Sequence, residues 1–248
     1  MSKATLYVFS ISHYCEKAKW ALDICNIEYE LKVLIPPTYA KATQHLDTAK
    51  PSVPILQTPA GEVIQGSPGI VVWANSQNEK FLVSDESNHI ERRLDAALGL
   101  HIRRWFYSES LIDCPKIVKP CFTFGAHFLD KILMMFAWSK VVPVMIQRMD
   151  LGPAQELESK AIVERELAWL EEKLADGRKY LVDGQFSNAD IAAASLLAPA
   201  FSIKEHPLNS VFTLPTRISA TCESWSGRPI EQWLKRIYKE HRWRENTH

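Results

Sequence analysis

The sequence carries no net charge, because 29 lysines and arginines balance 29 aspartates and glutamates. No global field therefore favours nucleic acid or an acidic membrane surface as a partner. The five cysteines are an odd number without a dense framework, and no charged-then-apolar leader opens the chain. Both features favour a reducing compartment, so we expect a cytoplasmic protein.

Long hydrophobic runs are also missing. A membrane-spanning helix needs roughly 20 apolar residues with few charges. The segment 122–146 comes nearest, with an apolar run from Ile132 to Trp138, but charges and a proline interrupt it: Asp130, Lys131, Lys140 and Pro143. We therefore expect a buried or substrate-facing helix there and no membrane span.

Several motifs for catalysis and binding are absent as well. The eight histidines show no metal-ligand spacing, and the cysteines form no Cys-x-x-Cys pair. The sequence contains no phosphate loop, nucleophile elbow or Rossmann glycine pattern. We therefore expect no metal site.

The first part of the chain predicts alternating strands and helices. Residues 5–9 are strand formers, and from Glu16 apolar side chains recur with helical spacing until Asn26, a plausible helix stop. Residues 28–35 read as a second strand. A strand-helix-strand unit of this length implies a right-handed crossover between parallel strands.

A hairpin and a helix are predicted next. Two short apolar runs, 51–57 and 62–65, flank a Pro/Gly turn. Ser67 is then expected as the N-cap of a helix with Pro68 at its first position. The element order is that of a thioredoxin-like α/β domain.

Strand signals largely stop after Leu82, so we place a domain boundary near 78–86. We expect a thioredoxin-like domain at 1–80 and an all-helical (all-α) domain at 87–248. Ser87 can cap its first helix, and Ser187 with Asp190 forms a capping-box variant that opens another.

Three segments together resemble soluble glutathione S-transferases. They are the turn and helix from Ser12 to Leu22, the segment Ser52-Val-Pro-Ile-Leu56, and Phe186-Ser-Asn-Ala-Asp-Ile-Ala192. No single segment is specific, but their order and spacing are. The resemblance implies a homodimer that binds glutathione as co-substrate and a hydrophobic small molecule.

The resemblance further implies that Ser12 activates the glutathione thiol. A hydroxyl at the start of a helix can donate to sulfur, and the oriented N–H groups favour negative charge. The alternative is that Ser12 is only a helix N-cap. Ser10, Tyr14 and Cys15 are runner-up catalytic groups, although Cys15 is expected to be a buried packing residue.

Glutathione itself is expected to lie along the thioredoxin-like domain. By the resemblance, Val53 and a cis Pro54 would pair with its cysteinyl backbone, although an ordinary trans proline is the alternative. Ser67 at a helix start suits the γ-glutamyl carboxylate. Gly66 stands where the family usually has an acidic residue, and Gln65 is the candidate substitute.

The hydrophobic substrate is expected to contact residues of 101–140. The candidates are aromatic residues and methionines that could equally fill the helical core: Trp105, Phe106, Phe128, Met134, Met135 and Phe136. The basic pairs Arg92-Arg93 and Arg103-Arg104 are interpreted as a polar face or a dimer contact.

Two other functions remain open at this stage. The chain could be a non-catalytic binding or scaffold protein that kept the fold, because Gly66 replaces the acidic residue. It could also be a glutathione-dependent thiol reductase that uses Cys15 alone.

Overall fold

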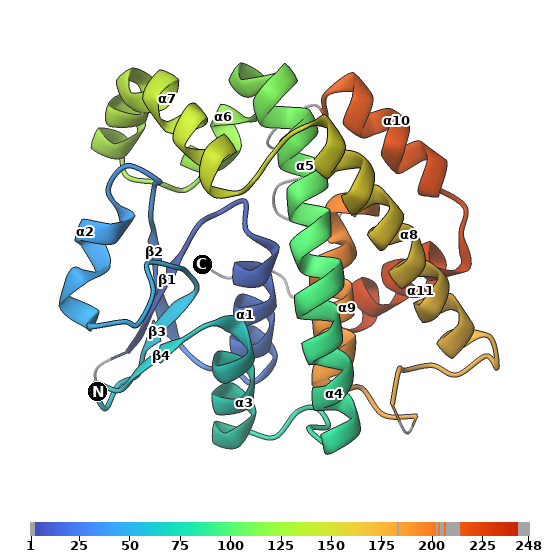
Figure 1. Ribbon diagram of the computed structural model, residues 1–248. Helices are drawn as coiled ribbons and strands as arrows, with labels where there is room; N and C mark the ends of the chain where they lie inside the picture. Colours follow the sequence, from blue (N-terminus) through green and yellow to red (C-terminus); the bar gives the residue numbers. More distant parts are fainter. Residues whose placement is uncertain (1–2, 183, 202, 204–205, 207–213, 243–248) are drawn as a thin grey trace.

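A four-stranded mixed sheet forms the centre of the N-terminal part of the chain (Figure 1). The computed structural model describes residues 3–182, 184–201, 203, 206 and 214–242. The strands are β1 (Ala4–Val8), β2 (Tyr29–Val33), β3 (Ile55–Gln57) and β4 (Val63–Gln65), in the order β2-β1-β3-β4. The pair β1 and β2 is parallel, whereas β3 is antiparallel to both β1 and β4. This is the predicted thioredoxin-like arrangement.

Helix α1 (His13–Ile24) makes the parallel crossover between β1 and β2. Its start is fixed by Ser12, whose side chain accepts a hydrogen bond from the Cys15 N–H. Its end is fixed by Asn26, which adopts a positive φ of 56°. Such a left-handed residue commonly ends a helix, so the predicted stop is confirmed.

The remaining elements of the N-terminal part are α2 (Tyr39–Thr43), a 3-10 turn at Gln44–Leu46, and α3 (Ser67–Gln77). Helix α3 packs against α1 on the same side of the sheet (Figure 1). Its N-cap is Gly66 and not Ser67 as predicted, because Ser67 already has helical geometry and forms the first residue of the helix.

All the described elements from Asp85 onward are helical. They are α4 (Asp85–Leu94), a π-helical turn (Asp95–Gly99), α5 (Leu100–Asp113), α6 (Pro115–Thr123), α7 (Phe128–Arg148), α8 (Pro153–Leu174), α9 (Asn188–Phe201), α10 (Thr216–Trp225), α11 (Pro229–Ile237) and a second π-helical turn (Tyr238–Arg242). The first of them is capped by Ser84, with Ser87 as the reciprocal partner in a capping box. Ser87 is therefore at the third helical position and not the cap that we predicted.

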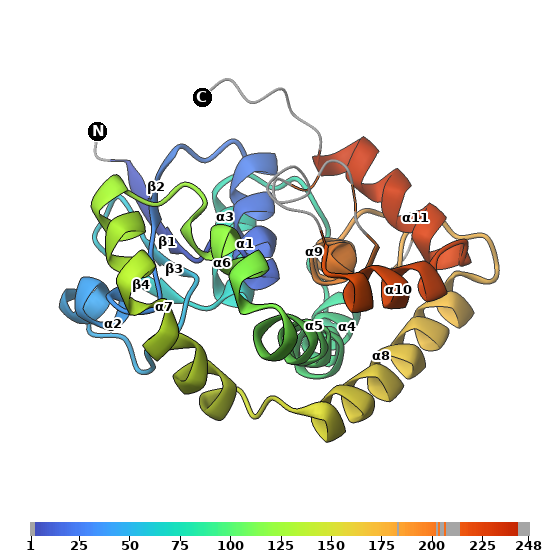
Figure 2. The same ribbon diagram turned by 90° about the horizontal axis from the view of Figure 1, so that it is seen from above.

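Helix α9 lies at the centre of the helical part and contacts α1, α4, α5, α10 and α11. Figure 2 shows it between α1 on one side and α11 on the other. The Asp190 carboxylate accepts hydrogen bonds from the Ser187 N–H (2.8 Å), the Ser187 hydroxyl (2.6 Å) and the Leu181 N–H (2.9 Å). The predicted reach of Asp190 back to Ser187 is thus confirmed, and it fixes the start of this buried helix.

Lys17 joins the sheet-bearing part of the chain to the helical part. Its side chain is fully buried, and its Nζ lies 2.7 Å from Glu91 Oε1 and 2.8 Å from Asp95 Oδ2. Asn188 donates a 2.7 Å hydrogen bond to the same Glu91. Helices α1, α4 and α9 therefore meet around one ammonium group, which holds α1, the helix that follows the turn at Ser12, against the helical part.

Glu16 makes a second connection, from α1 to the C-terminal π-helical turn. Its carboxylate is 3% exposed and lies 2.6 Å from Arg242 Nε and 3.1 Å from Lys19 Nζ. Burial alone would raise the pKa of this carboxyl, but the charges of Arg242 and Lys19 hold it well below its usual value of 4.5. Folding therefore favours the ionised form.

We predict that Glu16→Gln destabilises the protein in a pH-dependent way. Because the folded pKa is lowered, the carboxylate stabilises the fold above the unfolded pKa, and this contribution is lost as pH falls below about 4.5. Denaturant titrations should show the variant less stable by about 1–3 kcal/mol at pH 7. The difference in unfolding free energy between wild type and variant should become smaller below about pH 4.5. An equal difference at pH 7 and pH 4 would contradict this interpretation.

No helix within the described residues is long and apolar enough to cross a membrane. The helix predicted from the run 132–138 is α7, which lies beside α6 at the edge of the molecule (Figure 1).

Candidate active site at the start of α1

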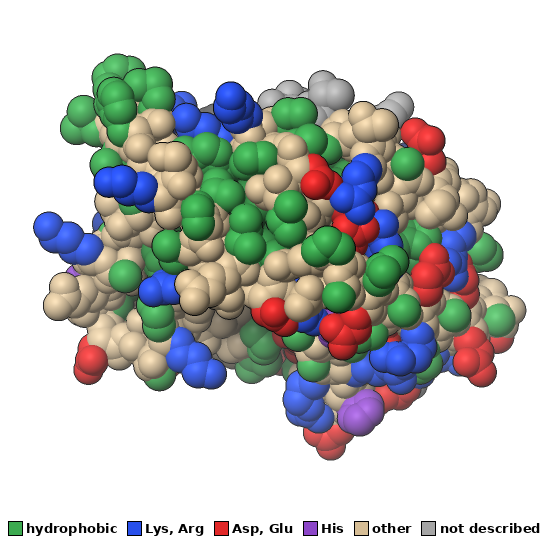
Figure 3. Space-filling model, turned by 45° about the horizontal axis from the view of Figure 1, so that its top comes forward, with side chains coloured by type: hydrophobic (Ala, Val, Ile, Leu, Met, Phe, Trp, Pro, Cys, Tyr) green, Lys and Arg blue, Asp and Glu red, His purple; other side chains and the backbone are tan. Residues whose placement is uncertain are grey.

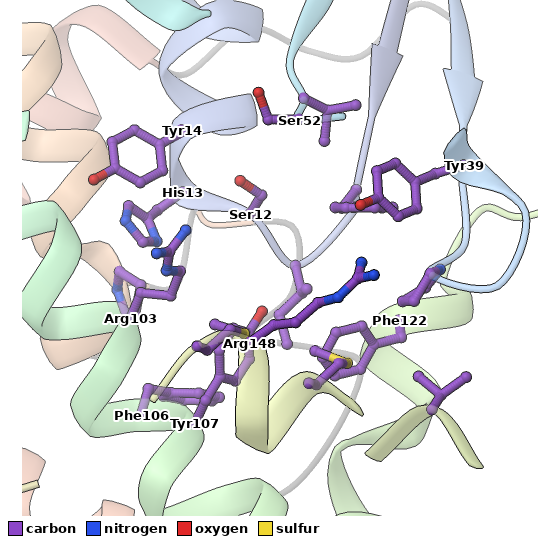
Figure 4. A pocket seen from close by; sticks show the side chains of 18 of the residues that line it. Ser12, His13, Tyr14, Tyr39, Ser52, Arg103, Phe106, Tyr107, Phe122 and Arg148 are labelled. Carbon is purple, nitrogen blue, oxygen red and sulfur yellow. The ribbon is translucent and has the colours of Figure 1, made fainter. Parts of the chain in front are cut away.

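A cavity of about 670 Å³ lies between loops of the sheet domain and the helical part of the chain. Its volume lies within the range of small-molecule binding sites. One wall comes from the turn before α1 and the loops that follow β2 and precede β3. The other comes from α5, α6 and α7 and the end of α9. The lining residues include Val53 and Lys140. Figure 4 shows Ser12, His13, Tyr14, Tyr39, Ser52, Arg103, Phe106, Tyr107, Phe122 and Arg148.

Ser12 lies on this cavity at the N-terminal end of α1. Its Oγ accepts a hydrogen bond from the Cys15 N–H at 3.3 Å. A hydroxyl can accept and donate at the same time, so the Ser12 oxygen can cap the helix while its hydrogen, which is within reach of the Cys15 sulfur, is free to be donated. Capping the helix therefore leaves the Ser12 hydrogen available to a ligand, so the capping role and a catalytic role are compatible.

His13, the first residue of α1, lies next to Ser12 and is buried. The His13 ring is 4% exposed, and its Nε2 lies 3.1 Å from the Gly99 carbonyl oxygen. Burial, assisted by the nearby positive charge of Arg103, lowers the pKa of His13 to about 3. The imidazole is therefore neutral at physiological pH and adds no positive charge to the cavity.

Tyr14, a runner-up catalytic group, has a hydroxyl that is already hydrogen-bonded within the protein. Its hydroxyl donates a 2.8 Å hydrogen bond to the Asp95 carbonyl oxygen. Burial, with the negative charge of Asp95, raises the pKa of the phenol to about 12. The group is protonated and already engaged with the backbone of the π-helical turn, so it has no free hydrogen for a thiolate.

The other two runner-up groups lie outside the cavity lining. The Ser10 hydroxyl donates to the Phe124 carbonyl oxygen. Cys15 is 1% exposed, and burial raises the pKa of its thiol to about 11 in spite of the hydrogen bond with Ser12. A protonated, buried thiol is a poor nucleophile, and the structure therefore agrees with a packing role for Cys15.

Val53 lines the cavity. The Val53–Pro54 bond is cis, as the resemblance implies. Neither the N–H nor the C=O of Val53 forms a hydrogen bond with the described residues. An extended ligand could pair with both groups as a strand does.

The segment Gln65-Gly66-Ser67 is not part of the cavity lining, but Gln65 contacts the lining residue Ser52. The Gln65 amide donates to Ser52, to its carbonyl oxygen at 3.0 Å and its hydroxyl at 3.2 Å. The Ser67 hydroxyl is buried and has no hydrogen-bond partner among the described residues. Gln65 thus braces the loop before Val53, and the start of α3 keeps an unpaired polar group.

Gly66 has a structural reason to replace an acidic residue. Its φ of 92° and ψ of 145° lie in a region that L-residues rarely adopt, and its N–H donates to the Pro54 carbonyl oxygen at 2.9 Å. A side chain at this position would be strained whatever space surrounds it.

We predict that Gly66→Ala lowers the free energy of unfolding by about 1–3 kcal/mol, the cost of holding alanine in this backbone region. Chemical denaturation of the variant measures this loss. The control is Gly61→Ala, which changes another positive-φ glycine in the β3–β4 turn away from the cavity. Glutathione affinity should fall with Gly66→Ala and stay unchanged with Gly61→Ala; equal affinity in both variants would contradict this interpretation.

The structure corrects most of the predicted hydrophobic site. Phe106 lines the cavity, but its neighbour Trp105 is fully buried in the helical core, where its Nε1 donates to Glu109 Oε1 at 2.8 Å. Phe128 and Met135 are 68% and 56% exposed on α7 and contribute nothing to the cavity. Figure 3 shows hydrophobic side chains gathered on the outer surface over α7. Of the other two candidates, Met134 is a core residue and Phe136 is exposed.

The cavity wall contains residues that sequence reasoning missed, above all Arg103, Tyr107, Phe122 and Arg148. Tyr107 and Phe122 stack with ring centroids 5.7 Å apart. The Tyr107 hydroxyl has no hydrogen-bond partner among the described residues. Helical spacing in α5 places Arg103, Phe106 and Tyr107 on neighbouring positions of one face, but only the packing of α5 shows that this face borders a cavity.

The described residues include no group of three or more histidine, cysteine, aspartate or glutamate side chains that could hold a metal ion.

Two family models match the chain in the order of its two parts. The glutathione S-transferase N-terminal domain matches residues 6–80, and the glutathione S-transferase C-terminal domain matches residues 133–220. The chain belongs to the glutathione S-transferase family. No curated protein sequence matches this member of the family.

Solved structures of the glutathione S-transferase fold are similar over nearly the whole chain. A glutathione S-transferase of Ceriporiopsis subvermispora in complex with glutathione is 12% identical, with 99% of this chain and 100% of that chain covered and a TM-score of 0.61. A glutathione S-transferase from Methylobacillus flagellatus with glutathione bound is 15% identical, with 94% and 98% covered and a TM-score of 0.54. Glutaredoxin 2 from Salmonella typhimurium in complex with glutathione is 17% identical, with 96% of each chain covered and a TM-score of 0.50. At these identities the similarity shows the fold alone.

Proposed function

We propose that the protein is a glutathione transferase in which Ser12 activates the glutathione thiol for attack on a hydrophobic electrophile. The observation that carries the proposal is the position of Ser12, at the start of α1 and on the wall of the cavity, where its oxygen caps the helix as an acceptor and its hydroxyl can still donate to a sulfur atom.

The chemistry follows from the properties of a thiol. The thiolate is the nucleophile, and an unperturbed thiol has a pKa of about 8.5, so at neutral pH most of it is protonated. A donated hydrogen bond and the N-terminal end of α1 both stabilise negative charge on sulfur and so lower this pKa. Proximity to the electrophile in one cavity then removes much of the entropic cost of a bimolecular reaction.

Glutathione would lie along the sheet domain with its sulfur at Ser12. Its cysteinyl backbone would pair with the free N–H and C=O of Val53 beside the cis Pro54, and its γ-glutamyl carboxylate would meet the start of α3 at Ser67. Gln65, next to Gly66, offers an amide in place of the acidic side chain that the family usually has. The electrophile would occupy the part of the cavity lined by Phe106, Tyr107 and Phe122.

With an aromatic halide as electrophile, the reaction balances without a further reactant. The sulfur forms a bond to the ring carbon, the carbon–halogen bond breaks, and halide leaves while the thiol proton passes to solvent. The Ser12 hydroxyl keeps its own proton throughout and only donates a hydrogen bond to the thiolate.

The proposal is tested by retention on immobilised glutathione together with conjugation of 1-chloro-2,4-dinitrobenzene. We expect the protein to be retained, to be eluted by free glutathione, and to form the conjugate faster than the uncatalysed reaction. Retention without conjugation would contradict the proposal and favour a non-catalytic binding or scaffold protein.

A thiol reductase that uses Cys15 is the other alternative, and the buried, protonated thiol counts against it. It requires a mixed disulfide between Cys15 and glutathione. We expect mass spectrometry after treatment with oxidised glutathione to find no such adduct on Cys15. The homodimer stays a prediction, for which the measurement is the mass in solution by light scattering.

A further inference from the structure

Two arginines on the cavity wall differ from most other described arginines because they form no ion pair with a described residue. Among the described arginines, all form ion pairs with carboxylates except Arg92, Arg103 and Arg148. Two of these three exceptions, Arg103 and Arg148, line the cavity, and Lys140 on the same wall has no ion pair with a described residue either. Two of the three arginines without an ion pair among the described residues therefore line this cavity, whereas nine of the ten described lysines without one lie outside its lining.

The cavity lining contains no aspartate or glutamate among the described residues. His13 on the same wall is neutral, because burial and Arg103 lower its pKa. The net charge of the lining is therefore positive, although most of the remaining wall is apolar or aromatic. A positive, largely apolar site complements a ligand that has a hydrophobic body and a negative group.

Arg103 is the best placed of these cations. It extends from α5 toward His13 and the turn at Ser12, whereas Arg148 extends from α7 on the opposite side of the view (Figure 4). Arg103 is half-buried, and its Nε is shielded from solvent with no hydrogen-bond partner among the described residues. A buried donor without a partner costs free energy, and a planar guanidinium matches the two oxygens of a carboxylate.

We infer that the second ligand of this cavity is a hydrophobic anion, such as an aromatic carboxylate, whose charged group binds Arg103 and whose body packs against Phe106, Tyr107 and Phe122. The inference rests on the proposed function for the role of this ligand as the electrophile. Binding of the anion itself does not require turnover. Arg103 is then the residue that selects acids over neutral molecules of the same shape.

The test compares two ligands of the same hydrocarbon skeleton, 2-naphthoate and its neutral amide, by isothermal titration calorimetry without glutathione. We expect the wild-type protein to bind the acid at least about 10-fold more tightly than the amide, the strength of one charge-assisted hydrogen-bonded pair. Arg103→Gln should abolish this preference by weakening acid binding while leaving amide binding unchanged. Arg103→Lys should retain a preference for the acid, because it keeps the charge.

Arg92→Gln is the matched control, since Arg92 also lacks an ion pair but lies on α4 outside the cavity lining. It should leave both affinities unchanged. Equal wild-type affinity for acid and amide would overturn the inference, and this comparison needs no variant to fold. Loss of acid and amide binding to the same extent in a folded Arg103→Gln protein would also overturn it.

Retention on immobilised glutathione, measured on the same proteins, separates the two proposals. If the protein prefers the acid but is not retained on immobilised glutathione, the proposed function is contradicted and the anion site is still supported. If Arg103→Gln weakens retention on immobilised glutathione but keeps the preference for the acid, Arg103 binds glutathione and not the second ligand. That result would overturn the inference.

Discussion

Ser12→Ala should lower the turnover of conjugation by about 10²- to 10³-fold, the loss typical of removing one hydrogen bond to a developing or bound anion. The variant keeps the cavity, Val53 and the start of α3, so its affinity for glutathione should change only a few-fold. The split between turnover and binding is what distinguishes a group that acts on the sulfur from one that only holds the ligand.

Structural loss has to be separated from chemical loss in this variant, because Ser12 is also the N-cap of α1. Removing a serine N-cap costs about 1 kcal/mol of stability, which circular dichroism melting will reveal. Ser10→Ala is the matched control, since the Ser10 hydroxyl is bonded to the Phe124 carbonyl and lies outside the cavity lining. Its turnover should equal that of the wild type.

Tyr107→Phe tests a competing hydroxyl that the structure adds to the cavity on the α5 wall. If this variant loses turnover while Ser12→Ala keeps it, the sulfur is activated from α5 and not from the turn before α1. We expect the opposite order, because Tyr107 is buried and the pKa of its phenol is raised by that burial, with Arg103 opposing it.

Lys17→Met should lower the free energy of unfolding by about 3–5 kcal/mol, the usual cost of removing one partner from a buried ion pair. The methionine fills much the same space, but Glu91 and Asp95 then lose the only cation within 4.0 Å of them among the described residues. Burial already raises the pKa of Asp95 against the opposing effect of Lys17. Denaturant unfolding followed by fluorescence measures the loss.

The pH dependence of this variant is a second check. Without Lys17 the charge that opposes the effect of burial is gone, so the folded pKa of Asp95 should rise further above its unfolded value. Stability of the variant should then fall as pH rises, and its deficit should be larger at pH 8 than at pH 5. Lys3→Met, which removes an exposed pair with Glu28, should cost no more than about 1 kcal/mol. Equal losses from the two lysines would contradict this account of the domain junction.

The sequence predicted the sheet domain and several helix ends because their signals are local. The change from strand to helix after Ser12, the stop at Asn26 and the reach of Asp190 to Ser187 each depend on residues a few positions apart. The same is true of the hairpin before α3. Only the exact caps were wrong, by one residue at Ser67 and by three at Ser87, because Gly66 and Ser84 supply the backbone geometry there.

The cavity could not be predicted in the same way, because its lining depends on which helix faces meet. Trp105 and Phe106 are adjacent in sequence, yet one fills the core and the other borders the cavity. Phe128 and Met135 belong to α7, whose apolar run from Ile132 to Trp138 predicted a buried or substrate-facing helix, but both side chains are exposed. Arg103 looked like half of a polar pair; only the structure shows that Arg104 pairs with Asp150 and Glu158 while Arg103 does not.

The measurement that tests the central claim most directly is the ionisation of the glutathione thiol bound to the protein, followed by the ultraviolet absorbance of the thiolate as pH is varied. The account predicts that the wild-type protein lowers the thiol pKa by at least about one unit from its free value of about 8.5, and that Ser12→Ala restores most of the shift. A bound thiol with an unshifted pKa in the wild type, or the same lowered pKa in Ser12→Ala, would contradict it.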